Sequence, residues 1–188
     1  EVAEARARRR HINRPKGQSD SSRFDQTLGY RIHEGKVDLV SAVVSMMPPA
    51  WENDKRLSSS VRDMLEYFSL YEEKNDGPAA VIFGDGRIIG ARLDRLGLRP
   101  LRSVETEEYL AVMSEAGQVK FPQEEVISLG RIGAGGMMYY DHEEKKIYKT
   151  VDALEKLSKQ KDYAQALKES QTHIRLLSGQ SDTEFLEK

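Results

Sequence analysis

The first third of the chain has apolar side chains at helical spacing. Large apolar residues recur every four positions from Phe24 to Ile32, and Asp20 or Ser21 just before them can cap a helix. A second apolar stretch follows Asp38, and a third follows a run of serines. Glycine and the residues before a Pro-Pro pair mark helix ends. The pattern therefore predicts three helices, over residues 20–34, 38–47 and 58–71.

The pattern changes to short β-type runs after Asn75-Asp76-Gly77-Pro78. Residues 79–83 and 87–93 are apolar runs joined across Gly84-Asp85-Gly86, which is a strong hairpin signal. Turn residues separate further strand candidates at residues 101–104, 109–113, 126–129, 137–140 and 146–148. From residue 151 the period is helical again, and residues 178–188 form a polar tail.

This order of elements predicts an α+β fold, with helices first, then an antiparallel sheet, then a C-terminal helix. Helices segregated in this way cover one face of a sheet. Residues 79–83 and 137–140 are almost continuously apolar, as in strands that are buried on both faces. We therefore expect further structure, from outside the chain, to cover the sheet.

Composition excludes several classes of function. The chain has 188 residues with 29 Lys+Arg and 31 Asp+Glu, for a formal net charge of -2, so we expect no nucleic-acid partner. No apolar run approaches the roughly 20 residues needed to cross a bilayer, so we expect no membrane partner and a cytoplasmic location. Cysteine is absent, which excludes disulfides and thiol nucleophiles within the chain. The four histidines are not spaced as metal ligands, and we expect no metal site.

The chain divides into three regions. Residues 1–16 are a basic leader. A solvated segment is a simpler interpretation of these residues than a phosphate-binding arm. Residues 17–150 form the main domain, and residues 151–188 form the C-terminal helix and polar tail.

The sharpest motif is Asp94-Arg95-Leu96-Gly97-Leu98-Arg99-Pro100-Leu101. Asp94 ends a strand, Gly97 suits a turn, and Pro100 restricts the residue before it to an extended conformation. On chemistry alone, the segment indicates a tight turn held by a buried arginine–aspartate pair.

Other polar features favour ordinary structural roles. The acidic pairs Glu72-Glu73 and Glu124-Glu125 indicate solvated charge rather than an acid/base dyad. Ser114-Glu115 follows an apolar strand, but a nucleophilic serine would need a base that the sequence does not place.

The Asp94 motif resembles the "DxxGxRPL" hairpin of class II glutamine amidotransferases. Three other stretches, in their order and spacing, are similar to the glutaminase domain of the glutamate synthase large subunit: Gly17-Gln18-Ser19-Asp20-Ser21, Met46-Met47-Pro48-Pro49-Ala50-Trp51-Glu52 and Asn75-Asp76-Gly77-Pro78-Ala79-Ala80. The resemblance runs from Gly17 to Lys149. It implies an N-terminal-nucleophile hydrolase fold with αββα layers, incomplete here, so that residues 17–150 would be the distal half of a glutaminase domain.

The resemblance also implies how the chemistry is divided. In this family an N-terminal cysteine is the nucleophile, its α-amino group is the base, an Asn-Gly pair contributes to the oxyanion hole, and an arginine holds the substrate carboxylate. None of these has a counterpart in the chain, which therefore carries no catalytic residue and is predicted to be inactive alone. An aspartate in a Ser-Asp segment holds the substrate ammonium, and Asp20 matches it. A plain helix cap at Asp20 is the structural alternative. Asp94, Gly97, Arg99 and Pro100 carry over as the structural hairpin motif.

The implied function is part of a glutamate synthase-type glutamine amidotransferase. Such an enzyme hydrolyses glutamine and uses the ammonia for glutamate biosynthesis, with FMN and iron–sulfur clusters in other domains and no cofactor in this chain. The implied partners are glutamine, the missing glutaminase half and the synthase domain or subunit, and we expect self-association through an apolar sheet face. Two alternatives remain open: a non-catalytic binding or structural module derived from a glutaminase domain, and the glutaminase part of another class II enzyme such as amidophosphoribosyltransferase.

Overall fold

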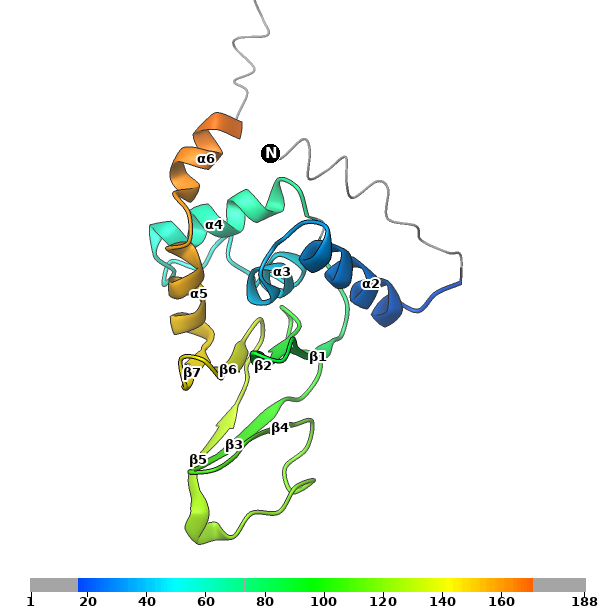
Figure 1. Ribbon diagram of the computed structural model, residues 1–188, viewed down its shortest axis with the longest axis vertical. Coiled ribbons are helices and arrows are strands. Elements are labelled where there is room, and N and C mark those ends of the chain that lie inside the picture. Colours follow the sequence, from blue (N-terminus) through cyan, green and yellow to red (C-terminus); the bar gives the residue numbers. More distant parts are fainter. Residues whose placement is uncertain (1–16, 73, 171–188) are drawn as a thin grey trace, which may run out of the picture.

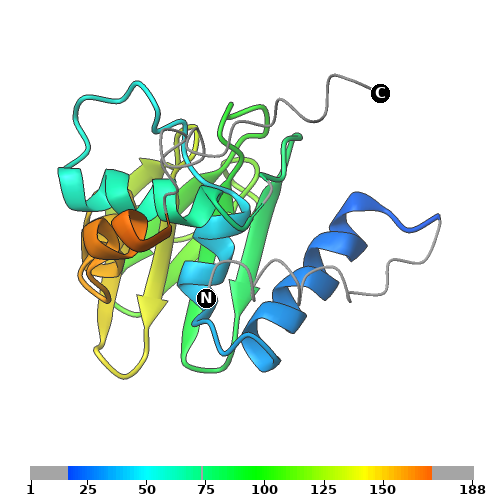
Figure 2. The same cartoon turned by 90° about the horizontal axis from the view of Figure 1, so that it is seen from above.

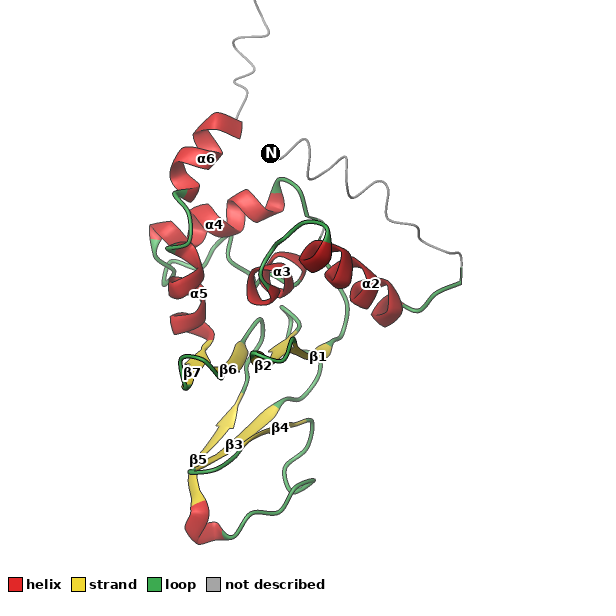
Figure 3. Ribbon diagram, viewed as in Figure 1, coloured by secondary structure: helices red, strands yellow, loops and turns green. Residues whose placement is uncertain are grey.

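A computed structural model describes residues 17–72 and 74–170, and the basic leader at residues 1–16 lies outside them. The three predicted N-terminal helices are present, and Figure 3 shows them preceding the strands. They are α2 (Asp20–His33), α3 (Leu39–Met46) and α4 (Ser59–Ser69). Each begins at a side-chain cap, because Asp38 and Ser58 accept backbone N–H bonds from Ser41 and Val61. The cap of α2 is Ser19, so capping by Asp20 or Ser21 is wrong by one or two residues.

All seven predicted strands form, but they make two sheets rather than one (Figure 1). The first is antiparallel with the order β1-β2-β6-β7, and the second is antiparallel with the order β4-β3-β5. The strands of the first sheet are β1 (Ala80–Gly84), β2 (Ile88–Leu93), β6 (Met137–Asp141) and β7 (Lys146–Lys149). Those of the second are β3 (Arg102–Thr106), β4 (Leu110–Met113) and β5 (Val126–Arg131), which follows a short 3-10 helix η1 (Gln123–Glu125).

The C-terminal helix is divided into two, α5 (Thr150–Ser158) and α6 (Tyr163–Ser170). The break has a local cause, since the Asp162 side chain accepts a hydrogen bond from the Gln165 backbone N–H at 3.0 Å and so starts a new helix. Both helices contribute to the core, through Leu154 and Leu157 of α5 and Leu167 of α6. The polar tail predicted for residues 178–188 lies outside the described residues.

The helices cover the upper face of the four-stranded sheet, and the second sheet covers only part of its lower face, so the cover expected from outside the chain comes in part from the chain itself. In Figure 1 the helices lie above the four-stranded sheet and the three-stranded sheet lies below it. The main core joins α3, α4, α5 and α6 to the upper face, through side chains that include Phe83, Met137 and Tyr139. On the lower face, Ala91 and Leu93 of β2 share a second cluster with residues that flank the three-stranded sheet. The described residues thus form one helix layer and two sheet layers.

Helix α2 contacts α3 and projects to one side of the other helices, beside the edge strand β1 (Figure 2). Phe24 and Leu28 of α2 join Met46, Met47 and Val81 in a third apolar cluster. This cluster attaches α2 to β1. Strand β1 pairs with β2 along one edge, and no described strand pairs with its other edge. Within residues 17–72 and 74–170, no helix is both long and apolar enough to cross a membrane.

Candidate functional site

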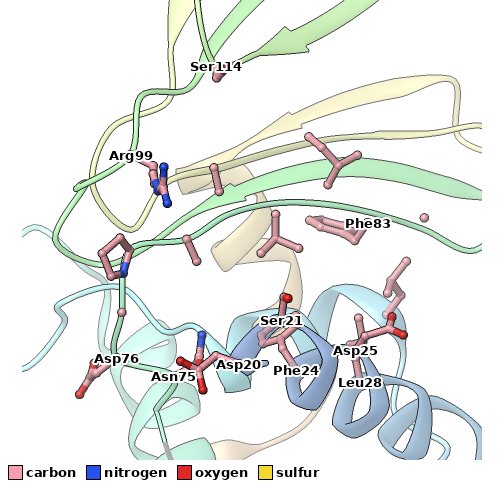
Figure 4. Close-up of a pocket in the computed structure, with 18 of the residues that line it drawn as sticks. Asp20, Ser21, Phe24, Asp25, Leu28, Asn75, Asp76, Phe83, Arg99 and Ser114 are labelled. Carbon is pink, nitrogen blue, oxygen red and sulfur yellow. The ribbon is translucent and has the colours of Figure 1, made fainter. Parts of the chain in front are cut away.

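A cleft of about 970 Å³ lies between α2 and the open edge of β1 (Figure 4). Residues of α2 form one wall, and β1 and the loop that carries Arg99 form the other. The loop that precedes β1 closes one end through Asn75, Asp76 and Gly77. The cleft is open because β1 is an edge strand with a neighbour on one side only. Three of the four stretches that carry the family resemblance therefore meet at this cleft.

Asp20 lies at the mouth of the cleft, as the first residue of α2 (Figure 4). Its side chain is 83% exposed and forms an ion pair with Arg23 on the next turn. An exposed pair of this kind is weak, so a ligand cation can replace Arg23 as its partner. The amino end of a helix favours the charged carboxylate. Since Ser19 is the cap, Asp20 is not needed to start the helix.

The Asp94 motif is a turn, but among the described residues no buried arginine–aspartate pair holds it. Asp94 is buried, and its carboxylate accepts hydrogen bonds from the backbone N–H groups of Leu96 at 3.0 Å and Leu98 at 3.2 Å. A third bond, from the Ala79 N–H at 3.3 Å, ties the turn to the start of β1. Arg99 is exposed and lines the cleft, so the expected buried pair is wrong. Backbone N–H groups take the place of an arginine, because the tight turn points several of them at the Asp94 carboxylate.

These backbone bonds also determine the charge state of the turn. Burial would raise the pKa of Asp94, but the N–H groups of Leu98, Ala79 and Leu96 outweigh it and hold the pKa below its usual value. Gly97 has a φ of 68°, and a Cβ there would lie 3.0 Å from the Cβ of Ala134. The turn therefore requires both an ionised Asp94 and a glycine, and it positions Arg99 and Pro100 at the cleft.

The loop before β1 brings further acidic groups to the cleft. The Asn75 backbone N–H donates to the Met46 carbonyl at 2.9 Å, and the Asp76 carboxylate lies 3.2 Å from Nε of Arg95. Among the described residues, four carboxylates line the cleft, those of Asp20, Asp25, Asp76 and Glu115, together with the guanidinium of Arg99. Asp20 and Asp76 each pair with an arginine, so the cleft borders cationic as well as acidic groups, and the exposed carboxylate of Asp20 is the one that can receive an ammonium.

Ser114 and Glu115 also line the cleft, beyond the end of β4 (Figure 4). Oγ of Ser114 accepts a hydrogen bond from the Gln118 side-chain amide at 3.2 Å. That contact supplies a donor rather than a base, so this geometry does not activate the serine. Among the described residues, no group of three or more His, Cys, Asp or Glu could hold a metal ion.

The ion pair between Arg31 and Glu72 was missed by sequence reasoning. Their side chains are 6% and 3% exposed, so the interpretation of Glu72 as solvated charge is wrong. Glu73 lies outside the described residues. A signal was present, because Arg31 lies three residues after Leu28, on the apolar face of the helix. The pair joins the carboxyl end of α2 to the segment that follows α4, and so fixes the helix that carries Asp20.

Comparisons with known proteins match the chain to one family and to several relatives. The family model of class-II glutamine amidotransferases matches residues 10–166. Ferredoxin-dependent glutamate synthase of Antithamnion sp. is 32% identical over 170 residues, which are 89% of this chain and 11% of the relative. Ferredoxin-dependent glutamate synthase 2 of Synechocystis sp. is 34% identical over 153 residues, 80% of this chain and 10% of the relative. Glutamate synthase [NADH] of Schizosaccharomyces pombe is 38% identical over 133 residues, 70% of this chain and 6% of the relative. The chain thus spans about a tenth of these relatives or less.

Proposed function

Because the chain belongs to the class II glutamine amidotransferase family, we propose that it forms the distal part of the glutaminase domain of a glutamate synthase. The family match over residues 10–166 carries this proposal. The similarity to three glutamate synthases supports that type of enzyme over other class II enzymes. The complete domain would hydrolyse glutamine to glutamate and ammonia, and the ammonia would serve glutamate biosynthesis.

In this proposal the chain binds substrate, and another part of the polypeptide supplies the nucleophile. The 188 residues include no cysteine, so a thiol nucleophile has to come from outside them. The same absence means that the chain cannot ligate an iron–sulfur cluster through thiolates, and such clusters would belong to other domains. The open edge of β1 is where a strand of the nucleophile-bearing part would pair. That part would complete the αββα layers of the N-terminal-nucleophile hydrolase fold.

Asp20 would hold the α-ammonium group of glutamine at the mouth of the cleft. Its carboxylate is exposed there, among other acidic groups, and needs only to exchange Arg23 for the ligand. A charge-assisted hydrogen bond to an ammonium is roughly twice as strong as a neutral one. The turn at Asp94 would act indirectly, by fixing the loop that borders the same cleft.

We expect Asp20→Asn to lower kcat/KM for glutamine by about ten- to a hundredfold, because the amide keeps the shape but loses the charge. The measurement is steady-state ammonia release from a polypeptide that joins this chain to the nucleophile-bearing part. Asp20→Ala should lower kcat/KM at least as much. Its melting temperature should stay close to that of the parent, because Ser19 caps the helix.

Asp25→Asn is the matched control, since Asp25 lies on the same helix and lines the same cleft. It should change kcat/KM much less than the variant at Asp20. Equal losses for the two variants would indicate a general effect of cleft charge. Unchanged kinetics in Asp20→Asn would refute its role in binding substrate.

We also expect the chain to self-associate when the nucleophile-bearing part is absent. Ile82 and Ile89, on the lower face of the four-stranded sheet, are 59% and 53% exposed. Ile127 and Leu129, on the outer face of the three-stranded sheet, are 62% and 76% exposed. Exposed apolar strands of this kind promote association. Sedimentation velocity should show dimers or larger species at tens of micromolar.

Leu129→Lys should shift this equilibrium toward the monomer by placing a charge on the apolar face. Leu96→Lys is the control, because Leu96 is 64% exposed but lies in the turn after β2. A parent chain that remains monomeric at these concentrations would contradict the expectation.

A further inference from the structure

The side chain of Arg92, on β2, is fully buried and only partly bonded. Its exposed fraction is 0%, and its Nε donates to the Met47 carbonyl at 2.7 Å. Within the described part of the chain, Nη1 and Nη2 have no hydrogen-bond partner. A guanidinium carries five donors, and buried donors without acceptors destabilise a fold. Two of its three nitrogens therefore lack the acceptors that burial requires.

The buried acids of the described residues are all bonded elsewhere. Glu72 pairs with Arg31, and Asp141 pairs with Arg87. Asp94 accepts the backbone N–H groups of its own turn. Burial lowers the pKa of Arg92 to about 9, so the group still carries its charge at neutral pH. An unpaired buried charge is costly, and a fold that keeps one has a counter-charge for it.

The position of Arg92 indicates where a counter-charge can come from. Val81 of β1 is its register partner, and directly opposite residues of an antiparallel pair project from the same face. Val81 also lines the cleft and packs in one cluster with Met47. Arg92 thus lies one strand in from the open edge, beside Val81, which borders the cleft. Met47 packs in the same cluster as Val81, and methionine is unbranched and re-packs easily, so a rearrangement of this cluster can admit a group from the cleft to the guanidinium.

We propose that Arg92 is a carboxylate-binding residue, and that its Nη1 and Nη2 receive a carboxylate that enters from the cleft between α2 and β1. Two parallel N–H bonds to one carboxylate are the preferred geometry of a guanidinium. The source is an acidic side chain of the segment that pairs with β1, and Arg92 joins the two parts of the domain. This choice of source rests on the proposed function, whereas the carboxylate site itself does not.

Formate is the probe for the free chain, because it is the smallest carboxylate. Thermal unfolding is followed in sodium formate and in sodium chloride at equal ionic strength. At formate about ten times its Kd, the melting temperature should rise by about 3–6 °C relative to chloride. Arg92→Met should abolish this difference. Arg102→Met, at an exposed arginine of β3, should preserve it.

A second variant covers the case in which Arg92→Met does not fold. Arg92→Lys keeps a charge but not the paired N–H groups, and it should lose at least half of the formate shift. The proposal is overturned if formate and chloride give the same melting temperature in the parent chain. It is also overturned if the formate shift persists undiminished in the variants at position 92.

The source of the carboxylate is tested in the polypeptide that includes the nucleophile-bearing part. If a side chain fills the site, formate should no longer raise the melting temperature. A persisting shift, which glutamate then suppresses, would overturn the side-chain source and assign the site to a free carboxylate. Failure of that polypeptide to release ammonia would contradict the proposed function and leave the result on the free chain intact.

Discussion

The 188-residue chain by itself is expected to release no ammonia from glutamine above a buffer blank. It contains no cysteine and no Asn-Gly pair, so the nucleophile and the expected oxyanion donors are absent from it. Ser114, at the cleft, contacts an amide donor instead of a base. Loss of a nucleophile lowers kcat by several orders of magnitude, on the order of 10⁶ in a serine protease. A coupled assay of ammonia with purified chain measures this directly.

The control is the same assay on the polypeptide that joins this chain to the nucleophile-bearing part. Its turnover should be orders of magnitude above the blank, and it should be lost when the cysteine is replaced by alanine. Turnover by the free chain at even a hundredth of the joined rate would contradict the division of chemistry proposed above. It would also indicate that a hydroxyl group lining the cleft acts as the nucleophile.

The elements were predictable because their signals are local. The Gly84-Asp85-Gly86 turn lies between two apolar runs, and β1 and β2 pair across it. Helix ends were less predictable, because serines stand at positions 19, 21 and 22 around Asp20 and each can cap a helix. Local patterns therefore established where elements occur, with errors of a few residues at their ends.

The division into two sheets was not predictable from these patterns. β2 pairs with β6, which lies more than forty residues further along the chain, while β3 pairs with β4 and β5. Strand alternation indicates which face of a strand is buried but not which strand lies beside it. The covering of the lower face of β2 by Leu101 and Ile132 follows from that pairing. The pairing of strands that are distant in sequence therefore determines how the strands divide between the two sheets.

The candidate site was predictable only in part. The family resemblance brought attention to Asp20 and to the Asp94 motif, and the structure places both at one cleft. The resemblance gave no role to Arg92, whose environment depends on β1 and on the Met47 carbonyl. Arg31 and Glu72 are 41 residues apart in the sequence. Nothing in the sequence distinguishes an acid that pairs over such a separation from a solvent-exposed acid. Buried charges were missed because burial depends on tertiary packing.

Breaking the buried pair at Glu72 should strongly destabilise the chain. Glu72→Gln leaves the Arg31 guanidinium, 6% exposed, without its counter-charge. Removal of one member of a buried pair typically costs about 3–5 kcal/mol. Urea unfolding should therefore show a lower midpoint with an unchanged slope. Arg56→Met, at the exposed pair with Asp54, is the control and should leave the midpoint unchanged.

The double variant Arg31→Met/Glu72→Leu tests the cause. Replacing both charges by apolar side chains removes the desolvation cost together with the attraction, so it should recover most of the stability lost in Glu72→Gln. Single variants that cost less than about 1 kcal/mol would show that the pair is solvated, contrary to its burial. Because the pair fixes α2 from its far end, Glu72→Gln should also weaken glutamine binding at Asp20 in the joined polypeptide, and the double variant should restore it.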